Sequence, residues 1–180
     1  MVGSRARLRW LAVVALVALV IVPSTSSHAL ARASSSTAGT LVFGSAVPVP
    51  SVDPAVGSDD AETIFLEALY DTLYRFQGNP PRLVPWLATK ASTSQNGSVW
   101  TIQVRKGVHF ANGDLLTARD VAYSFDRLLT IQQGYAYLFQ PIMHVGSVQA
   151  VEAYTVRFHL LHPFAAFLQT LPYAYIVDAT

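Results

Sequence analysis

The sequence predicts a fold that mixes α-helices and β-strands, of the α/β or α+β class, on three observations. Strict alternation of apolar and polar residues over 99–105 indicates a half-buried strand. Apolar residues recur at helical spacing over 118–129, which indicates an amphipathic helix. Two further runs, at 145–151 and 154–160, predict a pair of strands joined near Glu152. Since no internal repeat accompanies these elements, we expect one mixed architecture.

Residues 1–33 are expected to be an export signal rather than part of the fold. Three arginines, Arg5, Arg7 and Arg9, precede an apolar run at 10–22, and small residues suited to cleavage follow at 29–33. This apolar run is shorter than the roughly 18 to 20 residues that span a bilayer. A cleaved signal is therefore favoured, with an uncleaved anchor as the alternative.

The charge balance changes once this signal is removed. Eight basic and eleven acidic residues follow Ala33, which gives a net charge of −3. Neither nucleic acid nor an acidic membrane surface is therefore an expected partner. The absence of cysteine excludes disulfides, thiolate metal ligands and lipid attachment through a cysteine.

The first elements of the mature chain are a strand and a helix. Residues 41–45 predict a short buried strand, which Pro48 ends. A helix is predicted over 61–74, with anionic groups at 58–62 near its amino end. The apolar face assigned to this helix comprises Ile64, Phe65, Ala68, Leu69 and Leu73. A second compact piece is expected to begin at 83–87.

The central unit spans 99–127 and combines a strand, a turn and a capped helix. The predicted core face of its strand comprises Trp100, Ile102 and Val104. Residues 112–114, Asn-Gly-Asp, predict a tight turn. Thr117 is suited to cap the following helix, and Asp120, three residues later, completes a capping box in which Asp replaces the usual Glu or Gln.

The remaining elements are an aromatic segment, a strand pair and a helix. Residues 135–139 are predicted to pack through their aromatic side chains. In the second strand of the pair, one face comprises Tyr154, Val156, Phe158 and Leu160. Pro163 suits the first turn of a helix that carries Phe164, Phe167 and Leu168.

The run VWTIQVRKGVHFANGDLLTARDVAYSFDR at 99–127 closely resembles the signature of the extracytoplasmic solute-binding proteins of ABC importers, family 5, the oligopeptide, dipeptide and nickel-binding group. Val52-Asp53-Pro54 and the LYDTLY run at 69–74 match earlier motifs of that family in order and spacing. The resemblance covers about residues 40–180 and implies a periplasmic-binding-protein-like fold of type II. It further implies that this chain is an N-terminal fragment, about a third of a two-lobed cleft protein with an extra domain.

The resemblance also implies how the chain is divided. Residues 1–33 are the signal peptide and 34–66 the start of the first lobe. Residues 67–170 form an extra α+β domain of that lobe. Residues 171–180 return toward the first lobe, where the chain is truncated.

The acidic segment at 59–62 has two interpretations from its residues alone. Asp59, Asp60 and Glu62 are either paired carboxylates for acid–base chemistry or a solvated helix start favoured by the helix dipole, and composition favours the second. The resemblance adds a third interpretation, in which this segment lines the cleft and its backbone pairs with extended peptides. The ligand-contact candidates on this interpretation are Gly57, Ser58, Asp59 and Asp60. An acidic side chain there would also meet a ligand ammonium.

The second ligand-contact candidate is Tyr135 or Tyr137, because the resemblance places a ligand-facing tyrosine soon after the signature helix. Spacing does not choose between them, and ordinary packing in the core is the competing interpretation for each.

No catalytic or metal-binding constellation is predicted. The Gly-Ser pairs at 44–45 and 97–98 lack the G-x-S-x-G elbow of a serine hydrolase. The histidines are interpreted as surface or hydrogen-bonded residues, His109, His144, His159 and His162. We therefore expect no enzyme activity and no cofactor.

The expected function is that of an exported binding protein, a monomer that captures a peptide or similar small solute by lobe closure. Its second partner is the permease of an ABC importer. The expected location is the periplasm or the extracellular face of the cytoplasmic membrane. The alternative is a sensor or interaction module that uses the same fold without transport, and a hydrolase ranks third. The solute itself is left open, because the resembled group binds dipeptides, longer peptides, metal chelates and oligosaccharides.

Overall fold

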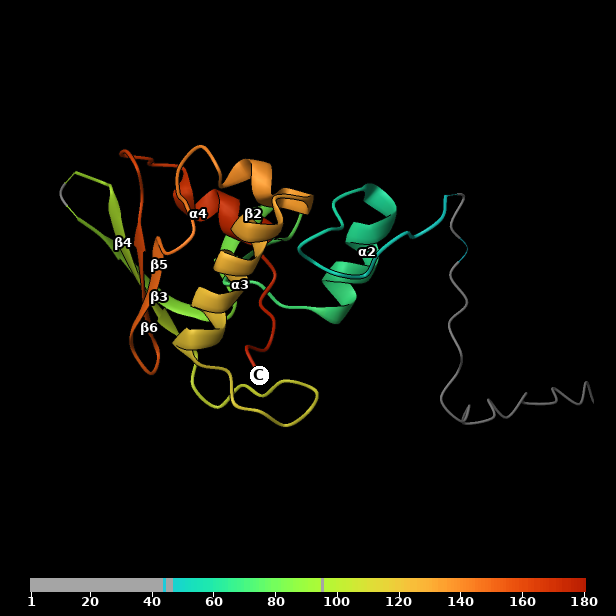
Figure 1. Cartoon of the computed structure of the whole chain (residues 1–180), viewed down its shortest axis with the longest axis horizontal. Helices are drawn as coiled ribbons and strands as arrows, with labels where there is room; N and C mark the ends of the chain where they lie inside the picture. The colour runs from blue at the N-terminus through green and yellow to red at the C-terminus, as the bar shows by residue number, and fades with distance from the viewer. Residues whose placement is uncertain (1–43, 45–46, 95) are drawn as a thin grey trace, which may run out of the picture. The chain divides into compact units, whose positions relative to one another are not determined.

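The computed structural model describes residue 44 and residues 47–94 and 96–180, shown in Figure 1. The predicted signal at 1–33 lies outside the described residues, as does the predicted strand at 41–45 apart from Gly44, which belongs to no helix or strand. Within the described ranges, none of the helices is both long enough and apolar enough to cross a membrane.

An antiparallel sheet forms the centre of the described region. Its four strands there follow the spatial order β3 (Ala88–Thr93), β4 (Val99–Val104), β6 (Thr155–His159) and β5 (Val148–Glu152). Ile102 of β4 lies between Ala91 of β3 and Val156 of β6. Alternation places Ile102 and Val104 in the core, as the sequence predicts. The predicted pairing of 145–151 with 154–160 is also confirmed.

Helix α3 (Ala118–Ile131) packs against β5 and β6, as Figure 1 shows. Phe125 lies edge-on to Phe158 of β6 and to Phe139, with ring centroids 5.1 and 5.3 Å apart. The predicted cap is confirmed: Thr117 Oγ1 accepts from the Arg119 amide at 3.3 Å. The Thr117 amide donates to the Asp120 carboxylate at 2.7 Å, which completes the capping box.

Helix α2 (Asp60–Leu69) is shorter than the predicted 61–74, and its predicted apolar face is wrong. The side chains of Ile64 and Leu69 are 49% and 60% exposed, whereas Leu66 is fully buried. Leu73 is buried but lies outside the helix, because its carbonyl accepts from the amides of Trp86 and Ala88. The chain is extended there to make these bonds, so the helix ends at Leu69.

Shorter elements complete the described region. The hairpin of β1 (Tyr74–Gln77) and β2 (Arg82–Pro85) forms a separate two-stranded sheet. The one-turn helices are η1 (Gly134–Leu138), α4 (Phe167–Thr170) and η2 (Leu171–Tyr173).

The helix predicted from Pro163 is wrong in its start. Helix α4 begins only at Phe167. The Leu160 amide donates to Ser98 O at 2.8 Å and the Phe164 amide to Gly97 O at 3.4 Å. These bonds tether the intervening chain to the turn before β4 and keep it from coiling.

Candidate functional site

The carboxylate of Glu62 organises the loop that precedes α2. It accepts from the backbone amides of Ser58 at 2.8 Å, Ser51 at 3.1 Å and Asp59 at 3.3 Å. Its side chain is only 5% exposed, and these charge-assisted bonds satisfy it there. In return, Asp59 Oδ1 accepts from the Glu62 amide at 2.8 Å, so the two acids form a capping box.

This arrangement occupies the amide groups of the predicted ligand-contact loop. The Gly57 amide donates to Asp53 O at 2.9 Å, and the amides of Ser58 and Asp59 are held by Glu62. Gly57 is buried so closely that a Cβ there would lie 3.1 Å from Glu62 Oε2. Asp60 differs, because its side chain is exposed and makes no hydrogen bond or ion pair with any residue that the structure describes. Of the loop's two aspartates, Asp59 is therefore committed to the cap and Asp60 is available.

A bidentate ion pair ties the same loop to helix α3. Arg127 Nη1 and Nη2 donate to Asp53 Oδ1 and Oδ2 at 2.7 and 2.6 Å. The Ala55 amide adds a third bond to Asp53 at 3.0 Å. The hydrogen bonds from Arg127 hold the pKa of Asp53 below its ordinary value, and Asp53 raises the pKa of Arg127. The two residues are 74 positions apart in the sequence, and their ion pair holds the loop before α2 against helix α3.

The structure brings the two predicted ligand-contact segments together. Gly134, at the start of η1, has a φ of 53°, and a Cβ on it would lie 3.1 Å from Gly57 O. Tyr135 is 8% exposed, and its hydroxyl lies 2.7 Å from Thr63 Oγ1 of α2. Tyr137 is 60% exposed, with its ring centroid 6.4 Å from that of Tyr135. The two tyrosines that spacing could not separate therefore differ, since one is packed and the other faces solvent.

Tyrosines from three parts of the chain gather beside α2. The ring centroid of Tyr135 lies 5.2 Å from that of Tyr173, and those of Tyr70 and Tyr175 are 6.3 Å apart. Tyr175 and Tyr135 both pack on Leu66. The pKa of Tyr175 lies well above its ordinary value, first because of burial and then because of the negative charge of Glu67.

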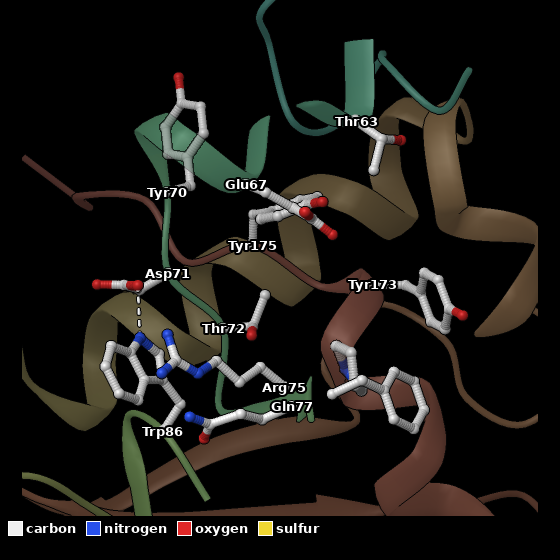
Figure 2. Close-up of a pocket in the computed structure, with 12 residues that line it drawn as sticks. Thr63, Glu67, Tyr70, Asp71, Thr72, Arg75, Gln77, Trp86, Tyr173 and Tyr175 are labelled. Carbon is white, nitrogen blue, oxygen red and sulfur yellow. Dashed lines mark hydrogen bonds between the residues drawn. The ribbon is translucent and has the colours of Figure 1, made fainter. Parts of the chain in front are cut away.

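A cavity of about 320 Å³ opens next to these tyrosines, between α2, the β1–β2 hairpin and the segment that follows α4. Figure 2 shows its wall, which comprises Thr63, Glu67, Tyr70, Asp71, Thr72, Arg75, Phe76, Gln77, Trp86, Pro172, Tyr173 and Tyr175. The Trp86 indole donates to Asp71 Oδ1, and the Arg75 guanidinium lies 3.3 Å from the centre of the Trp86 ring. The cavity therefore combines aromatic walls with acidic and basic groups.

No sequence argument predicted that Asp71, Arg75 and Trp86 would line one cavity, although Asp71 lies in the LYDTLY run at 69–74. They meet because β1 pairs with β2 and the chain then turns back, so that the Leu87 amide donates to Thr72 O. Such a contact depends on hairpin register, and no local spacing reveals it. The one available signal was composition, since Tyr70, Asp71, Arg75 and Trp86 place charges beside aromatic residues in a short stretch.

The four predicted surface histidines are exposed: His109, His144, His159 and His162. Across residues 47–94 and 96–180, no three His, Asp or Glu side chains are arranged to hold a metal ion.

The fold belongs to the type II class of periplasmic binding proteins, of which the described region is a portion. A sequence model described as "Bacterial extracellular solute-binding proteins, family 5 Middle" matches residues 82–180, and the chain belongs to this family. The family consists of binding proteins, which agrees with the absence of enzyme activity expected from the sequence.

Three similar proteins illustrate the family. The chain is 33% identical to the "Probable D,D-dipeptide-binding periplasmic protein DdpA" of Escherichia coli (strain K12), over 73% of this chain and 26% of that protein. It is 29% identical to the "Nickel-binding periplasmic protein" of the same strain, over 57% of this chain and 19% of that one. A solved structure of the periplasmic binding protein DppA from Helicobacter pylori, in complex with the peptide STSA, superposes with a TM-score of 0.61 at 29% identity. That match covers 71% of this chain and 28% of the other. The chain thus spans between about a fifth and just over a quarter of the length of these relatives.

Proposed function

We propose that this chain forms part of the first lobe of an exported solute-binding protein, which captures a peptide or similar small solute for an ABC importer. The family match over 82–180 is the observation that carries the proposal. Two of the similar proteins described above are named for dipeptide or nickel binding, and a third was solved with a bound peptide. The fold alone would not support this function, because one fold serves many functions.

The proposed mechanism is closure without chemistry. A ligand held between two lobes stabilises the closed form by the difference between its affinities for the closed and open forms. This chain would contribute a rigid surface to one side of the cleft. Its rigidity comes from the Glu62 carboxylate and the Asp53–Arg127 pair, which fix the loop at 51–59 before any ligand arrives. A surface fixed in advance loses little conformational entropy on binding.

The residues proposed to contact the ligand are those expected from the sequence. They are Gly57 to Asp60 and either Tyr135 or Tyr137. Asp60 and Tyr137 are exposed, which supports direct contact through their side chains. Gly57 and Ser58 would contribute through backbone carbonyls rather than amides, since their amides already have partners. The Asp59 amide is bonded to Glu62 and the Asp59 carbonyl to the Thr63 amide, so Asp59 would contribute by holding the loop in place. Tyr135 would act by supporting this surface through Thr63.

The remaining expectations belong to the same proposal. The protein would be monomeric, lie outside the cytoplasmic membrane and deliver its solute to a permease. It would have no enzyme activity and need no cofactor. The division into a first lobe at 34–66, an extra domain at 67–170 and a return at 171–180 also stays a prediction. In the described region, residues of the last segment meet 71–72, because Thr72 pairs with Tyr175 and the Ile176 amide donates to Asp71 O.

A thermal-shift screen of the complete open reading frame, with the signal removed, tests the proposal. The probes are mixed dipeptides, longer peptides, oligosaccharides and a nickel chelate. A ligand that binds the native state raises the melting temperature with its concentration. Stabilisation by one class with no loss of the compound would establish a solute binder. A flat response to every class would overturn the proposal, and consumption of a probe would indicate an enzyme instead.

A further inference from the structure

The turn between β3 and β4 contains an Asn-Gly pair, at the end of the hairpin that these strands form (Figure 1). The sequence has three asparagines, Asn79, Asn96 and Asn112. Asn79 precedes a proline, which has no backbone N–H, whereas the other two each precede a glycine. The side-chain amide of asparagine is open to attack by the backbone nitrogen of the next residue, and glycine, which has no Cβ, leaves the approach clear. Asn96 and Asn112 are therefore the two positions where this attack is sterically easiest.

Hydrogen-bond donors surround the side-chain oxygen of Asn96. Asn96 Oδ1 accepts from Ser94 Oγ at 2.6 Å, from Ser98 Oγ at 2.9 Å and from the Ser98 amide at 3.2 Å. The Ser94 oxygen accepts from the Val99 amide at 3.1 Å, so its own hydrogen is left to point at Asn96. Attack on the side-chain carbon places negative charge on Oδ1, and hydrogen bonds to an oxyanion are about twice as strong as those to a neutral oxygen. The three donors therefore stabilise the transition state more than the ground state.

Asn112 is held in the opposite way. Its Nδ2 donates to the carboxylates of Asp114 at 3.0 Å and Asp178 at 2.7 Å. One described donor, the Asp114 amide, reaches its Oδ1, at 3.0 Å. The two negative charges beside this side chain oppose the negative charge that develops during attack. Both bonds from Nδ2 must also break before that nitrogen leaves.

The two Asn-Gly pairs are otherwise alike. Both asparagines are exposed to water. The Gly97 amide donates to Ser94 O at 2.9 Å. The Gly113 amide donates to Phe110 O at the same distance, so the two attacking nitrogens start equally bonded. The contacts of the side chains therefore make the difference between the pairs.

We propose that Asn96 is a site of spontaneous covalent modification, which converts it to aspartate or isoaspartate through a succinimide. Hydroxide removes the proton of the Gly97 amide, and the nitrogen forms a bond to Asn96 Cγ. The Cγ–Nδ2 bond then breaks, and Nδ2 takes up a proton from water and leaves as ammonia. Water opens the ring at either carbonyl: cleavage at Cγ yields aspartate, and cleavage at the backbone carbonyl of Asn96 yields isoaspartate. The net reaction consumes one water and releases one ammonia.

The isoaspartate product would alter a turn that anchors another segment of the chain. In isoaspartate the main chain runs through Cγ and is longer by a methylene carbon. The carbonyls of the next two residues, Gly97 and Ser98, accept from the amides of Phe164 at 3.4 Å and Leu160 at 2.8 Å. We expect these two bonds to loosen in the isoaspartate form and to persist in the aspartate form, whose backbone is unchanged.

Peptide mapping by mass spectrometry tests the proposal on the complete open reading frame with the signal removed. The protein is aged in mildly alkaline buffer, and the peptides that contain Asn96 and Asn112 are followed. Asn96 should convert about tenfold faster than Asn112 or more, at a rate that rises in proportion to hydroxide. In urea the two rates should converge, because both side chains lose their surroundings. A ratio in the folded protein no larger than the ratio in urea would overturn the proposal.

A variant tests the activating donors directly. Ser98→Ala removes one side-chain donor to Asn96 Oδ1 and should slow its conversion about threefold or more. Ser92→Ala, on β3 outside the turn, is the matched control and should leave the rate unchanged. Circular dichroism verifies that both variants fold. Equal rates for Ser98→Ala and the wild type would also contradict the proposal.

Hydrogen exchange tests the structural consequence. The amides of Leu160 and Phe164 should exchange faster in the isoaspartate fraction of aged protein than in fresh protein, whereas Asn96→Asp should match fresh protein. Unchanged exchange in the isoaspartate fraction would show that the turn does not transmit the modification. None of these measurements depends on a bound solute, so the proposed function stands or falls separately.

Discussion

The guanidinium of Arg127 and the carboxylate of Asp53 face each other in a fork, with two parallel hydrogen bonds of 2.7 and 2.6 Å. The pair joins the Asp-Pro motif to the signature helix across 74 residues. The pair thereby holds the loop around Asp53 against helix α3, the helix that the sequence predicts most clearly.

Replacing Arg127 with Met should lower the free energy of unfolding by about 1 kcal/mol. Partly exposed ion pairs contribute less than buried ones, although bidentate geometry places this pair at the upper end of their range. Urea denaturation measures the change. Arg119→Met, in the same helix, is the control, because its side chain has no partner in the described region. Equal midpoints for the two variants would show that the fork does not stabilise the fold.

The same pair should make stability depend on acidity. Because Arg127 lowers the pKa of Asp53 below its ordinary value of 3.8, the unfolded chain takes up a proton before the folded protein does. The stabilisation that the Asp53–Arg127 pair contributes is complete above about pH 3.8. It is lost as the pH falls through the lowered pKa of Asp53 in the folded state. Asp53→Asn should therefore flatten the pH dependence of unfolding below about pH 4, and Arg127→Met should do likewise. A profile for Asp53→Asn that parallels the wild type throughout would contradict this.

Loss of the cap on α3 should be measurable by itself. Thr117→Ala removes the acceptor for the Arg119 amide and should cost about 0.5–2 kcal/mol of stability. Thr130→Ala is the matched control, since that hydroxyl only donates to a carbonyl within the helix. The denaturation midpoint should fall for the first variant and change little for the second. No difference between them would remove the capping argument.

Glu62→Gln should loosen the loop before α2. The substitution turns one acceptor oxygen into an NH₂ group that faces backbone N–H groups, so at least one partly buried amide loses its partner, at about 1 kcal/mol. Hydrogen exchange should accelerate at the amides of Ser58 and Ser51. Glu152→Gln, on the exposed end of β5, should leave those amides unchanged. Unaltered protection in Glu62→Gln would mean that the loop is fixed by other contacts.

The two neighbouring aspartates should separate folding from binding. Asp59→Ala removes a helix cap and should destabilise the protein by about 1 kcal/mol. Asp60→Ala removes an exposed side chain without a partner in the described region, so the melting temperature should stay as in the wild type while solute affinity falls. Thermal melting and calorimetry on both variants make the comparison. If Asp60→Ala binds as the wild type does, its proposed contact with the ligand is wrong.

The sequence predicted elements whose signals are local and missed those that depend on distant pairing. Thr117 and Asp120 were identifiable as a cap because both partners lie within one turn. The alternation of Ile102 and Val104 likewise defines a buried face within one strand. The sequence predicts helix α2 too long because Leu73 continues the helical spacing, whereas the Leu73 carbonyl accepts from the amides of Trp86 and Ala88.

The same contrast between local signals and contacts of distant residues applies to the candidate site. The position of Asp59 predicts a helix start, which the structure confirms, but the sequence does not reveal the burial of Glu62 under three amides, since one of the donors is Ser51, eleven residues away. Spacing does not distinguish Tyr135 from Tyr137; contacts of Tyr135 with Thr63 and Leu66 of α2 and with Tyr173 decide which one is packed.

The fixed position of Trp86 gives the cavity an optical reporter of its own. The sequence has three tryptophans, and one of them, Trp86, stacks under Arg75 and donates to Asp71 on the cavity wall. Trp100 packs against Phe167 instead, and no described group accepts from its buried indole N–H. Because indole emission responds to nearby charge and hydration, a solute that draws Arg75 away would change the fluorescence of Trp86 and leave that of Trp100 as an internal reference. Occupancy could then be followed in real time, without a label.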